Sequence, residues 1–449
     1  MGIARVAASH YLLSLLRHPL SVISLAATSH ILSDDGRGLL TVVYLIPNMV
    51  LLFANFGTSS AALYFLGKDL APKQRVLSTM LVSSFGFGVM WSLAIALAYA
   101  TVPGIVSDQV TWLMHCIILI QLPFTVVNQS LAKLMVYQHR IGREFAFELV
   151  IKAGNLASLL IFGLWILRGE PASDIVLAIV CTTLTLNIVR CAVLLGRMRR
   201  DIAAPPSFAL LKRMIIWGLP LTATVASMYL LHYGDQYLLQ LLGADPLAMV
   251  GVYTVAYSIF MVVVDIPRSV GSIFLRVSLE AVEQESDRVS ILIARRMAVL
   301  TIAVAGGLAL VSPWAIAILT PPEFAEASDI LRILLICSPL FAISAILERL
   351  LSGRLKVLRI AFAPLIALAV NVALNIAWIP EYGLAGAAWA TVVAYGALFV
   401  VRLWTCATVV GWAKVLNVFA FSSEDLRFFA SKAKAMLRIL RFSKEPPVS

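Results

Sequence analysis

The chain has 449 residues and a formal net charge of +11, and 61% of its residues are hydrophobic while only 13% are charged. Soluble domains carry about 25% charged residues, so this composition excludes an ordinary soluble protein and indicates an integral membrane protein. Nucleic-acid binding is the weaker explanation of the positive charge, because the sequence offers no soluble domain to carry it.

An apolar stretch of about 20 residues is long enough to span the hydrocarbon core of a bilayer. Twelve stretches of this kind predict an all-α integral membrane protein with about 12 transmembrane helices. Arg17 interrupts the first stretch without a small-residue cleavage site after it, so we expect a retained helix rather than a signal peptide. In chain order the stretches are 12–32, 39–66, 76–101, 110–135, 145–167, 175–195, 214–242, 248–275, 297–318, 328–348, 360–380 and 384–411.

Positive charge alternates between the gaps that separate these stretches. Of the 35 lysines and arginines, 26 lie in every second gap or in the two tails. The alternate gaps are short and mostly acidic, and their only basic residues are Arg37 and Arg168. Because cytoplasmic loops carry the excess of lysine and arginine, we predict a multi-pass protein with both termini in the cytoplasm.

An internal repeat divides the predicted membrane region. An offset of 213 residues places Gly38 over Gly251 and Trp165 over Trp378 in one register. With six spans each, two equivalent halves enter the membrane from the same side, and transporters built from such parallel repeats bind substrate between the halves. We therefore predict two six-helix bundles and a basic tail, at residues 1–205, 206–412 and 413–449.

The predicted tail differs from the rest of the chain. Ser422 or Ser423 is suited to cap a helix that has acidic residues in its first turn. Apolar residues then recur at helical spacing among basic ones. This pattern is typical of an amphipathic helix on the inner leaflet, and a positive tail that only sets the topology explains it equally well.

No motif for enzyme chemistry is present. The sequence has no nucleophile elbow, phosphate loop or His/Cys metal spacing, and its five cysteines lie in apolar stretches without a CxxC pair. We therefore expect no enzyme activity, no catalytic residue, no cofactor and no bound metal.

Seven basic residues lie inside the apolar stretches, where a central charge is costly unless it faces a cavity or a partner. Five lie near span ends, and we expect their long side chains to reach the interface: Lys133, Lys152, Arg190, Arg332 and Arg402. Arg17 and Arg268 are the exceptions, and they are the candidates for binding an anionic substrate. Asp265 shares a helix face with Arg268, so a pair and a substrate contact are both open.

Acidic and amide side chains within the stretches complete the candidate site. Asp265, Asp235 and Glu148 are candidates for coupling transport to protons or sodium. Asn371 and Asn375 are four residues apart on one helix face, and with Asn55 and Asn128 they are candidates for substrate contact. Hydrogen bonds between helices explain such amides at least as often.

Three segments resemble the polysaccharide-transporter (Wzx-type flippase) family of the MOP exporter superfamily. The first runs from Asp34 to Gly57 and the second from Gly218 to Tyr257. The third and most specific is Asn371-x3-Asn375-x3-Ile379-Pro380-Glu381-Tyr382-Gly383-x2-Gly386-Ala387-Ala388. Together with the twelve spans, the resemblance covers essentially the whole chain.

The resemblance implies two six-helix bundles around a V-shaped central cavity in the bacterial inner membrane. It also implies a flippase that moves an undecaprenyl-diphosphate-linked oligosaccharide to the outer leaflet by alternating access, driven by an ion gradient. The implied partners are this lipid-linked oligosaccharide, protons or sodium, and the polymerase and glycosyltransferases of glycan assembly. Arginine suits the diphosphate because its planar fork bonds two oxygens.

Three other functions compete with this one. Lipid II flippases of the superfamily typically have fourteen spans, and its multidrug antiporters usually carry an acidic cation site in the first span, which here has no acidic residue. A cation-coupled antiporter for small amphiphiles nevertheless remains an alternative. A membrane glycan polymerase or ligase usually needs a large outer loop, and the outer gaps here are very short. A scaffold for glycan assembly is the third alternative.

Overall fold

The computed structural model describes residues 17–101, 110–138, 141–199, 201–280, 283–354 and 357–420, together with Ser422 and Asp425. Within these ranges every secondary-structure element is a helix and none is a strand, which confirms the all-α prediction. Each of the twelve apolar stretches predicted from the sequence contains helix, but two of them are interrupted by turns: 39–66 at residues 52–57, between α2 and α3, and 328–348 at residues 336–337, between α11 and α12.

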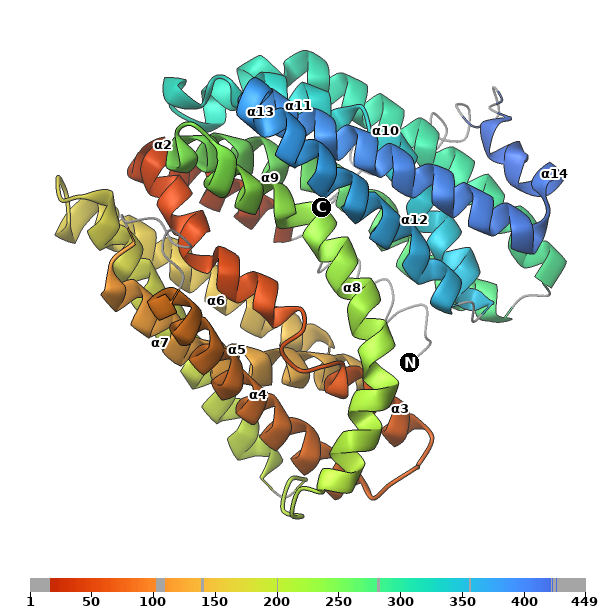
Figure 1. Ribbon diagram of the computed structural model, residues 1–449, viewed down its shortest axis with the longest axis horizontal. Helices are drawn as coiled ribbons and strands as arrows, with labels where there is room; N and C mark the ends of the chain where they lie inside the picture. Colours follow the sequence, from red (N-terminus) through yellow and green to blue (C-terminus); the bar gives the residue numbers. More distant parts are fainter. Residues whose placement is uncertain are drawn as a thin grey trace, which may run out of the picture. The chain divides into compact units, whose positions relative to one another are not determined.

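The first part of the chain forms helices α2 to α7, and a π-helical turn η1 (Phe162–Ile166) continues α6. Helices α4 to α7 lie side by side, with α5 in contact with both α4 and α7 (Figure 1). The bounds are α2 (Arg17–Leu51), α3 (Thr58–Gly67), α4 (Lys73–Thr101), α5 (Trp112–Tyr137), α6 (Ile141–Ile161) and α7 (Ala172–Met198).

The second part forms helices α8 to α14. Two short 3-10 segments, η2 (Pro322–Phe324) and η3 (Leu416–Phe419), precede α11 and follow α14. The helices are α8 (Phe208–Leu242), α9 (Pro246–Glu280), α10 (Glu283–Leu319), α11 (Ala327–Leu335), α12 (Ser338–Gly353), α13 (Val357–Val410) and α14 (Trp412–Val415).

Several of these helices are suited to cross a membrane. Among the described residues, seven are long and apolar enough, or eight if α11 and α12, which meet at a bend of 48°, form one span. Helices α2 and α13 each contain two of the predicted spans. The two spans meet at a break where the backbone leaves the helical region, at Ser33 (φ 60°) in α2 and at Gly383 (φ 56°) in α13. The fold is thus that of a multi-pass helical membrane protein.

The chain reverses its direction at both breaks, as contacts and backbone geometry there show. The guanidinium of Arg37 reaches back to the backbone carbonyl of Leu25, twelve residues earlier. Gly383 lies in the left-handed region of φ, which costs glycine little and residues with a Cβ much more. The Pro380 to Gly386 part of the third sequence motif is therefore the turn between two antiparallel spans.

The two glycines aligned by the internal repeat lie at one helix crossing. A Cβ at Gly38 on α2 would lie 2.0 Å from the carbonyl oxygen of Leu247 on α9. A Cβ at Gly251 on α9 would lie 2.2 Å from the carbonyl oxygen of Asp34 on α2. Small residues allow membrane helices to approach this closely, so the repeat marks a packing contact between equivalent helices. The division into two six-helix bundles remains a prediction.

The chain forms two compact units. The first comprises Met1–Ile259, Ser312–Ile333 and Leu368–Ala394, and the second comprises Phe260–Val311, Leu334–Ala367 and Tyr395–Ser449. In the first unit, apolar residues of α3, α4, α5, α7 and α8 form one buried cluster. In the second, α10, α12 and α13 pack around a cluster that includes Val415 and Val418.

Two of the arginines expected to reach the interface are instead paired in the interior. Arg190 is 8% exposed and donates hydrogen bonds of 2.6 and 2.8 Å to the carboxylate of Glu144. Arg402 is 1% exposed and donates to Glu348 at 2.7 Å. The expectation was wrong for these residues because a carboxylate on a neighbouring helix neutralises each charge in place. Arg332 is half-exposed and pairs with Asp329.

Of the predicted tail (413–449), the structure describes residues 413–420, which form most of α14 and η3, together with Ser422 and Asp425; the rest of the predicted amphipathic helix lies outside the described residues. The backbone N–H of Ser422 donates to the carboxylate of Asp425 at 3.2 Å. This contact, between an N-cap residue and the third helical residue, is the one that a capping box makes. It supports Ser422 as the predicted cap.

Candidate functional site

Asp235 is the centre of a buried polar cluster in the first unit. It lies on α8 and its side chain is 0% exposed. Tyr253 comes from α9, Asn371 and Asn375 from α13 before the break at Gly383, and Thr391 from α13 after it. All four are buried, and their convergence on one carboxylate depends on the chain reversal at Gly383.

Three side chains donate hydrogen bonds to the Asp235 carboxylate. The Tyr253 hydroxyl donates to Oδ2 at 2.7 Å, and the Asn375 amide donates to Oδ1 at 2.7 Å. The Thr391 hydroxyl also donates to Oδ2 and lies 3.2 Å from the Tyr253 hydroxyl. Asn371 lies beside the same carboxylate without a hydrogen bond of good geometry, although its backbone carbonyl accepts from Asn375 at 2.9 Å.

The cluster lacks a positive charge. Among the described residues no lysine, arginine or histidine lies within ion-pair distance of Asp235. Buried carboxylates are normally paired, because the cost of removing a charge from water greatly exceeds what neutral hydrogen bonds return. Asp235 is therefore a buried carboxyl group with no counter-charge among the described residues.

The same cluster contains acceptor oxygens that have no donor. The side-chain oxygens of Asn371 and Asn375 are buried without a hydrogen-bond partner. Carboxylate, amide and hydroxyl oxygens are the ligands of hard cations. One carboxylate supplies a single negative charge, and no described group of three or more His, Cys, Asp or Glu residues is placed to hold a metal ion. The arrangement is thus suited to a monovalent cation.

A second polar site, the Arg37 pocket, lies elsewhere in the first unit. It is a cavity of about 310 Å³ between both segments of α2, α6 and Ser258 of α9. Arg37 and Lys152 are its two charged lining residues. Its neutral polar lining comprises Ser21, Ser24, Thr28, Thr41, Asn155 and Ser258.

Arg37 is buried at 7% exposure without a carboxylate partner among the described residues. Its Nη1 donates to Thr28 Oγ1 at 2.6 Å, to Ser29 Oγ at 3.1 Å and to the carbonyl of Leu25 at 3.2 Å. Its Nε has no partner. A buried guanidinium that has only neutral hydrogen-bond partners and lines a cavity is suited to bind an anion.

Lys152 contributes a second cation to the Arg37 pocket. Its ammonium donates to Ser21 Oγ at 3.2 Å and lies 3.9 Å from the carboxylate of Glu148, one helical turn earlier. Glu148, a candidate for ion coupling, is therefore part of a half-exposed pair rather than an isolated buried acid. Lys152 faces a cavity and was expected only to reach the interface.

The remaining predicted residues whose side chains the structure describes do not join either site. Arg17 begins α2, and its side chain lies outside the described residues. Arg268 lies 3.5 Å from Asp265 and its guanidinium stacks over the ring of Phe341 at 5.1 Å. The expected pairing is thus present, with the Arg268 and Asp265 side chains 30% and 40% exposed.

Asn55 and Asn128 make contacts within the helical framework. The Asn55 amide donates to Ser59 and accepts from the backbone of Gly57, which shapes the break between α2 and α3. Asn128 on α5 donates to the backbone and side-chain oxygens of Asn187 on α7 at 3.0 and 3.1 Å. The Asn128 contacts match the interhelical hydrogen bonding that competes with substrate contact as an explanation, whereas the Asn55 contacts are local to the break.

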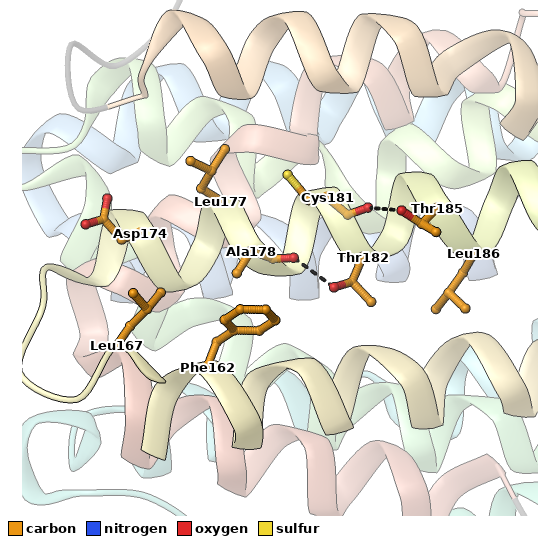
Figure 2. A pocket seen from close by; sticks show the side chains of 9 residues that line it. All are labelled: Phe162, Leu167, Asp174, Leu177, Ala178, Cys181, Thr182, Thr185 and Leu186. Atoms are coloured by element: carbon orange, nitrogen blue, oxygen red, sulfur yellow. Dashed lines mark hydrogen bonds between the residues drawn. The ribbon is translucent and has the colours of Figure 1, made fainter. Parts of the chain in front are cut away.

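A third cavity, of about 570 Å³, lies between η1 and α7 in the first unit (Figure 2). Its threonines donate to the backbone of their own helix, Thr182 to Ala178 and Thr185 to Cys181. These hydroxyls are therefore satisfied, and Phe162, Leu177 and Leu186 give the cavity an apolar surface. Its charged lining residue is Asp174, a carboxylate, so the cavity is not suited to recognise an anion.

Comparison with known proteins places the fold. No protein-family model matches the sequence, and no curated protein sequence matches it. The lipid II flippase MurJ in an inward closed conformation matches with a TM-score of 0.71 at 12% identity, over 97% of this chain and 98% of that chain. An inward-facing multidrug resistance MATE family transporter of the MOP superfamily matches with a TM-score of 0.65 at 15% identity, over 90% and 96%.

A third solved structure is a MOP superfamily transporter from Pyrococcus furiosus whose binding pocket is described as reversed in polarity. It matches with a TM-score of 0.59 at 14% identity, over 93% of this chain and 96% of that chain. The chain therefore has the fold of MOP superfamily transporters. The sequence differs from lipid II flippases in its number of predicted spans and from multidrug antiporters in the missing acidic residue of the first span. Solved structures of both kinds nevertheless match the fold of this chain.

Proposed function

We propose that the protein is a cation-coupled flippase. It moves an undecaprenyl-diphosphate-linked oligosaccharide from the cytoplasmic to the outer leaflet of the bacterial inner membrane, for assembly of a surface polysaccharide. The observation that carries the proposal is Asp235, a fully buried carboxylate that only neutral groups contact among the described residues. The fold shared with a lipid II flippase supports the choice of a lipid-linked cargo.

Coupling to a cation follows from the chemistry of the Asp235 cluster. A bound cation neutralises the carboxylate and draws together α8, α9 and both segments of α13, which all supply side chains to it. Loss of the cation leaves a buried negative charge and favours separation of these segments. Sodium fits better than a proton, because a proton on Asp235 supplies one O–H donor and satisfies at most one of the two unpartnered oxygens of Asn371 and Asn375, whereas a cation can be bound by both.

Recognition of an anionic cargo is assigned to the Arg37 pocket. Its volume of about 310 Å³ suits a diphosphate and not a whole oligosaccharide. Arg37 lines the pocket with a guanidinium that has no carboxylate partner among the described residues, and Lys152 supplies a second positive charge. Arg17 and Arg268 remain candidates for contacts with the same cargo. A pocket with two cations repels the cationic amphiphiles that a multidrug antiporter would carry.

The test is a cell that lacks the protein. The proposal expects lipid-linked oligosaccharide to accumulate in the inner leaflet and surface polysaccharide to be lost, with both restored by the wild-type chain. Drug hypersensitivity without accumulation of the glycan lipid would favour the antiporter. Elongation of lipid-linked glycan by the purified protein alone would favour the polymerase or ligase.

A further inference from the structure

A basic cavity in the second unit lies at the end of α10 that the charge pattern predicts to be cytoplasmic. Its volume is about 690 Å³, and it is bounded by α10 and by the segment that follows α13. Four of its lining residues are cations, namely Arg288, Arg295, Arg296 and Lys414. Neither the cation site nor the Arg37 pocket includes any of these residues.

Two buried carboxylates join the segment after α13 to α10. Asp287, on α10, accepts from Arg354 and lies 3.3 Å from the ammonium of Lys414. Asp425 lies 2.8 Å from Arg295 Nε and 3.5 Å from Arg296 Nε. Burial opposes ionisation of Asp425, but hydrogen bonds from Ser422 and Arg295 outweigh it and lower its pKa, so the carboxylate is charged.

These carboxylates leave an excess of positive charge. Among the described residues, five cations (the four that line the cavity and Arg354) lie with two carboxylates, Asp287 and Asp425, which is an excess of three cations over carboxylates (5 − 2). Arg288 is exposed on the cavity, and no described carboxylate lies within ion-pair distance of it. The cavity is thus suited to an anion, and its volume exceeds what inorganic phosphate fills.

Apolar residues beside the cavity indicate that it lies at the level of lipid headgroups. Trp412, Leu416 and Phe419 follow one another at helical spacing, and their side chains are 43–49% exposed. Exposed aromatic and aliphatic residues on a short helix next to cations are typical of a segment that lies in the membrane interface. Further along α10, Ile302 and Leu310 are 52% and 74% exposed, as expected for a surface that faces acyl chains.

We propose that this cavity binds the phosphate headgroup of an anionic phospholipid of the cytoplasmic leaflet. Arg288 and Lys414 contact the phosphate, Arg295 and Arg296 stay bound to Asp425, and the acyl chains lie along α10. Basic pockets between membrane helices on the cytoplasmic side bind anionic headgroups in this way. The bound lipid fixes α14 and η3 (Trp412–Phe419) against α10. The proposal does not depend on which cargo the protein carries.

The test compares lipid binding by the full-length purified protein and its variants. Native mass spectrometry and thermal unfolding follow added phosphatidylglycerol, with phosphatidylethanolamine and inorganic phosphate as separate arms. Arg288→Gln with Lys414→Gln is the test variant. Arg75→Gln with Lys212→Gln is the matched control, because it removes two exposed cations that the same charge pattern places in the cytoplasm.

We expect phosphatidylglycerol to bind and stabilise the wild type and the control, and to bind the test variant about thirtyfold more weakly. Equal weakening in test and control variants would overturn the proposal in favour of diffuse surface charge. Saturation by inorganic phosphate alone would overturn it in favour of a soluble anion. Since Lys414 also pairs with Asp287, Arg288→Gln alone is the second variant, and unchanged lipid binding there would equally contradict the proposal.

Discussion

Asp235 on α8 and Glu348 on α12 are both carboxylates inside the helical framework, but among the described residues only Glu348 has a positively charged partner. Glu348 accepts a hydrogen bond of 2.7 Å from Arg402, whose side chain is 1% exposed. Asp235 accepts from two hydroxyls and an amide, and no described cation lies near it. A charge that has its counter-charge in the protein holds helices together, whereas one that lacks it remains available to an ion from outside.

The arginines show the same contrast. Arg190 is bound to both oxygens of Glu144, whereas Arg37 contacts only hydroxyls and a carbonyl and keeps a free Nε. Arg190 belongs to the framework of the first unit, and Arg37 faces a cavity. Burial alone therefore does not identify a functional residue. A buried charge that has an ion-pair partner is a structural candidate, and a buried charge without one is a candidate for binding a ligand.

The largest effect is expected where a paired charge loses its partner. Glu348→Gln should lower the free energy of unfolding by about 3–5 kcal/mol, because it leaves the guanidinium of Arg402 buried without a carboxylate. Thermal unfolding of the purified protein measures this loss, with the exposed Glu326→Gln as the control. Replacing both Glu348 and Arg402 by methionine should restore most of the stability. No recovery in the double variant would contradict the pairing.

Asp235→Asn should act on transport and not on stability. The amide keeps the size of the side chain and removes its charge, so we expect cation-coupled transport to fall about 100-fold, equivalent to about 2.7 kcal/mol. Thermal stability in the absence of sodium should stay equal or rise, since an uncompensated charge is gone. Surface polysaccharide in a complemented null strain reports transport. The control is the exposed Asp245→Asn, and a loss of the same size there would contradict a specific role.

Arg37→Gln should weaken transport less than Asp235→Asn does. The loss of one charge-assisted hydrogen bond to a phosphate oxygen corresponds to about 2 kcal/mol, or about thirtyfold in affinity for the lipid-linked cargo. Binding of a diphosphate lipid to purified protein measures the change. Arg168→Gln is the matched control, because Arg168 is the other basic residue of the outer gaps and its side chain is exposed. Equal affinity in the Arg37 variant and the wild type would exclude the pocket.

The smallest effect is expected for Tyr253→Phe, which removes one of three donors to the Asp235 carboxylate. A single hydrogen bond contributes about 1 kcal/mol, so the half-saturating sodium concentration for transport should rise about fivefold. Maximal transport should be nearly unchanged. The exposed Tyr382→Phe should leave both quantities as they are, and a similar rise there would remove the support for Tyr253.

Helix content could be predicted from the sequence because it depends on local composition. Apolar stretches of membrane length predict helices regardless of which neighbours they pack against, and each of the twelve contains helix, although turns interrupt two of them at residues 52–57 and 336–337. The interior pairs could not be predicted in this way. Glu144 precedes Arg190 by 46 residues and Glu348 precedes Arg402 by 54, and nothing local indicates that the two helices of each pair touch.

Local composition also predicts part of the candidate site. Asp235, Asn371 and Asn375 stand out as polar residues in apolar stretches, and the structure brings these three together. Tyr253 and Thr391 do not stand out, because membrane-helix tyrosines are usually interfacial and threonines usually bond to their own helix. Arg37 also stands out in the sequence, because it is one of two basic residues in otherwise acidic gaps, but this position alone does not indicate that its side chain lines a pocket.

The central claim is that Asp235 binds a cation, and the sodium dependence of thermal unfolding tests it most directly. Wild-type protein is unfolded over a range of NaCl concentrations, with choline chloride keeping the ionic strength constant. Selective binding to the folded state predicts a midpoint that rises with sodium and saturates, and Asp235→Asn should show no sodium-specific rise. A rise of equal size in Asp235→Asn, or none in the wild type, would contradict the account.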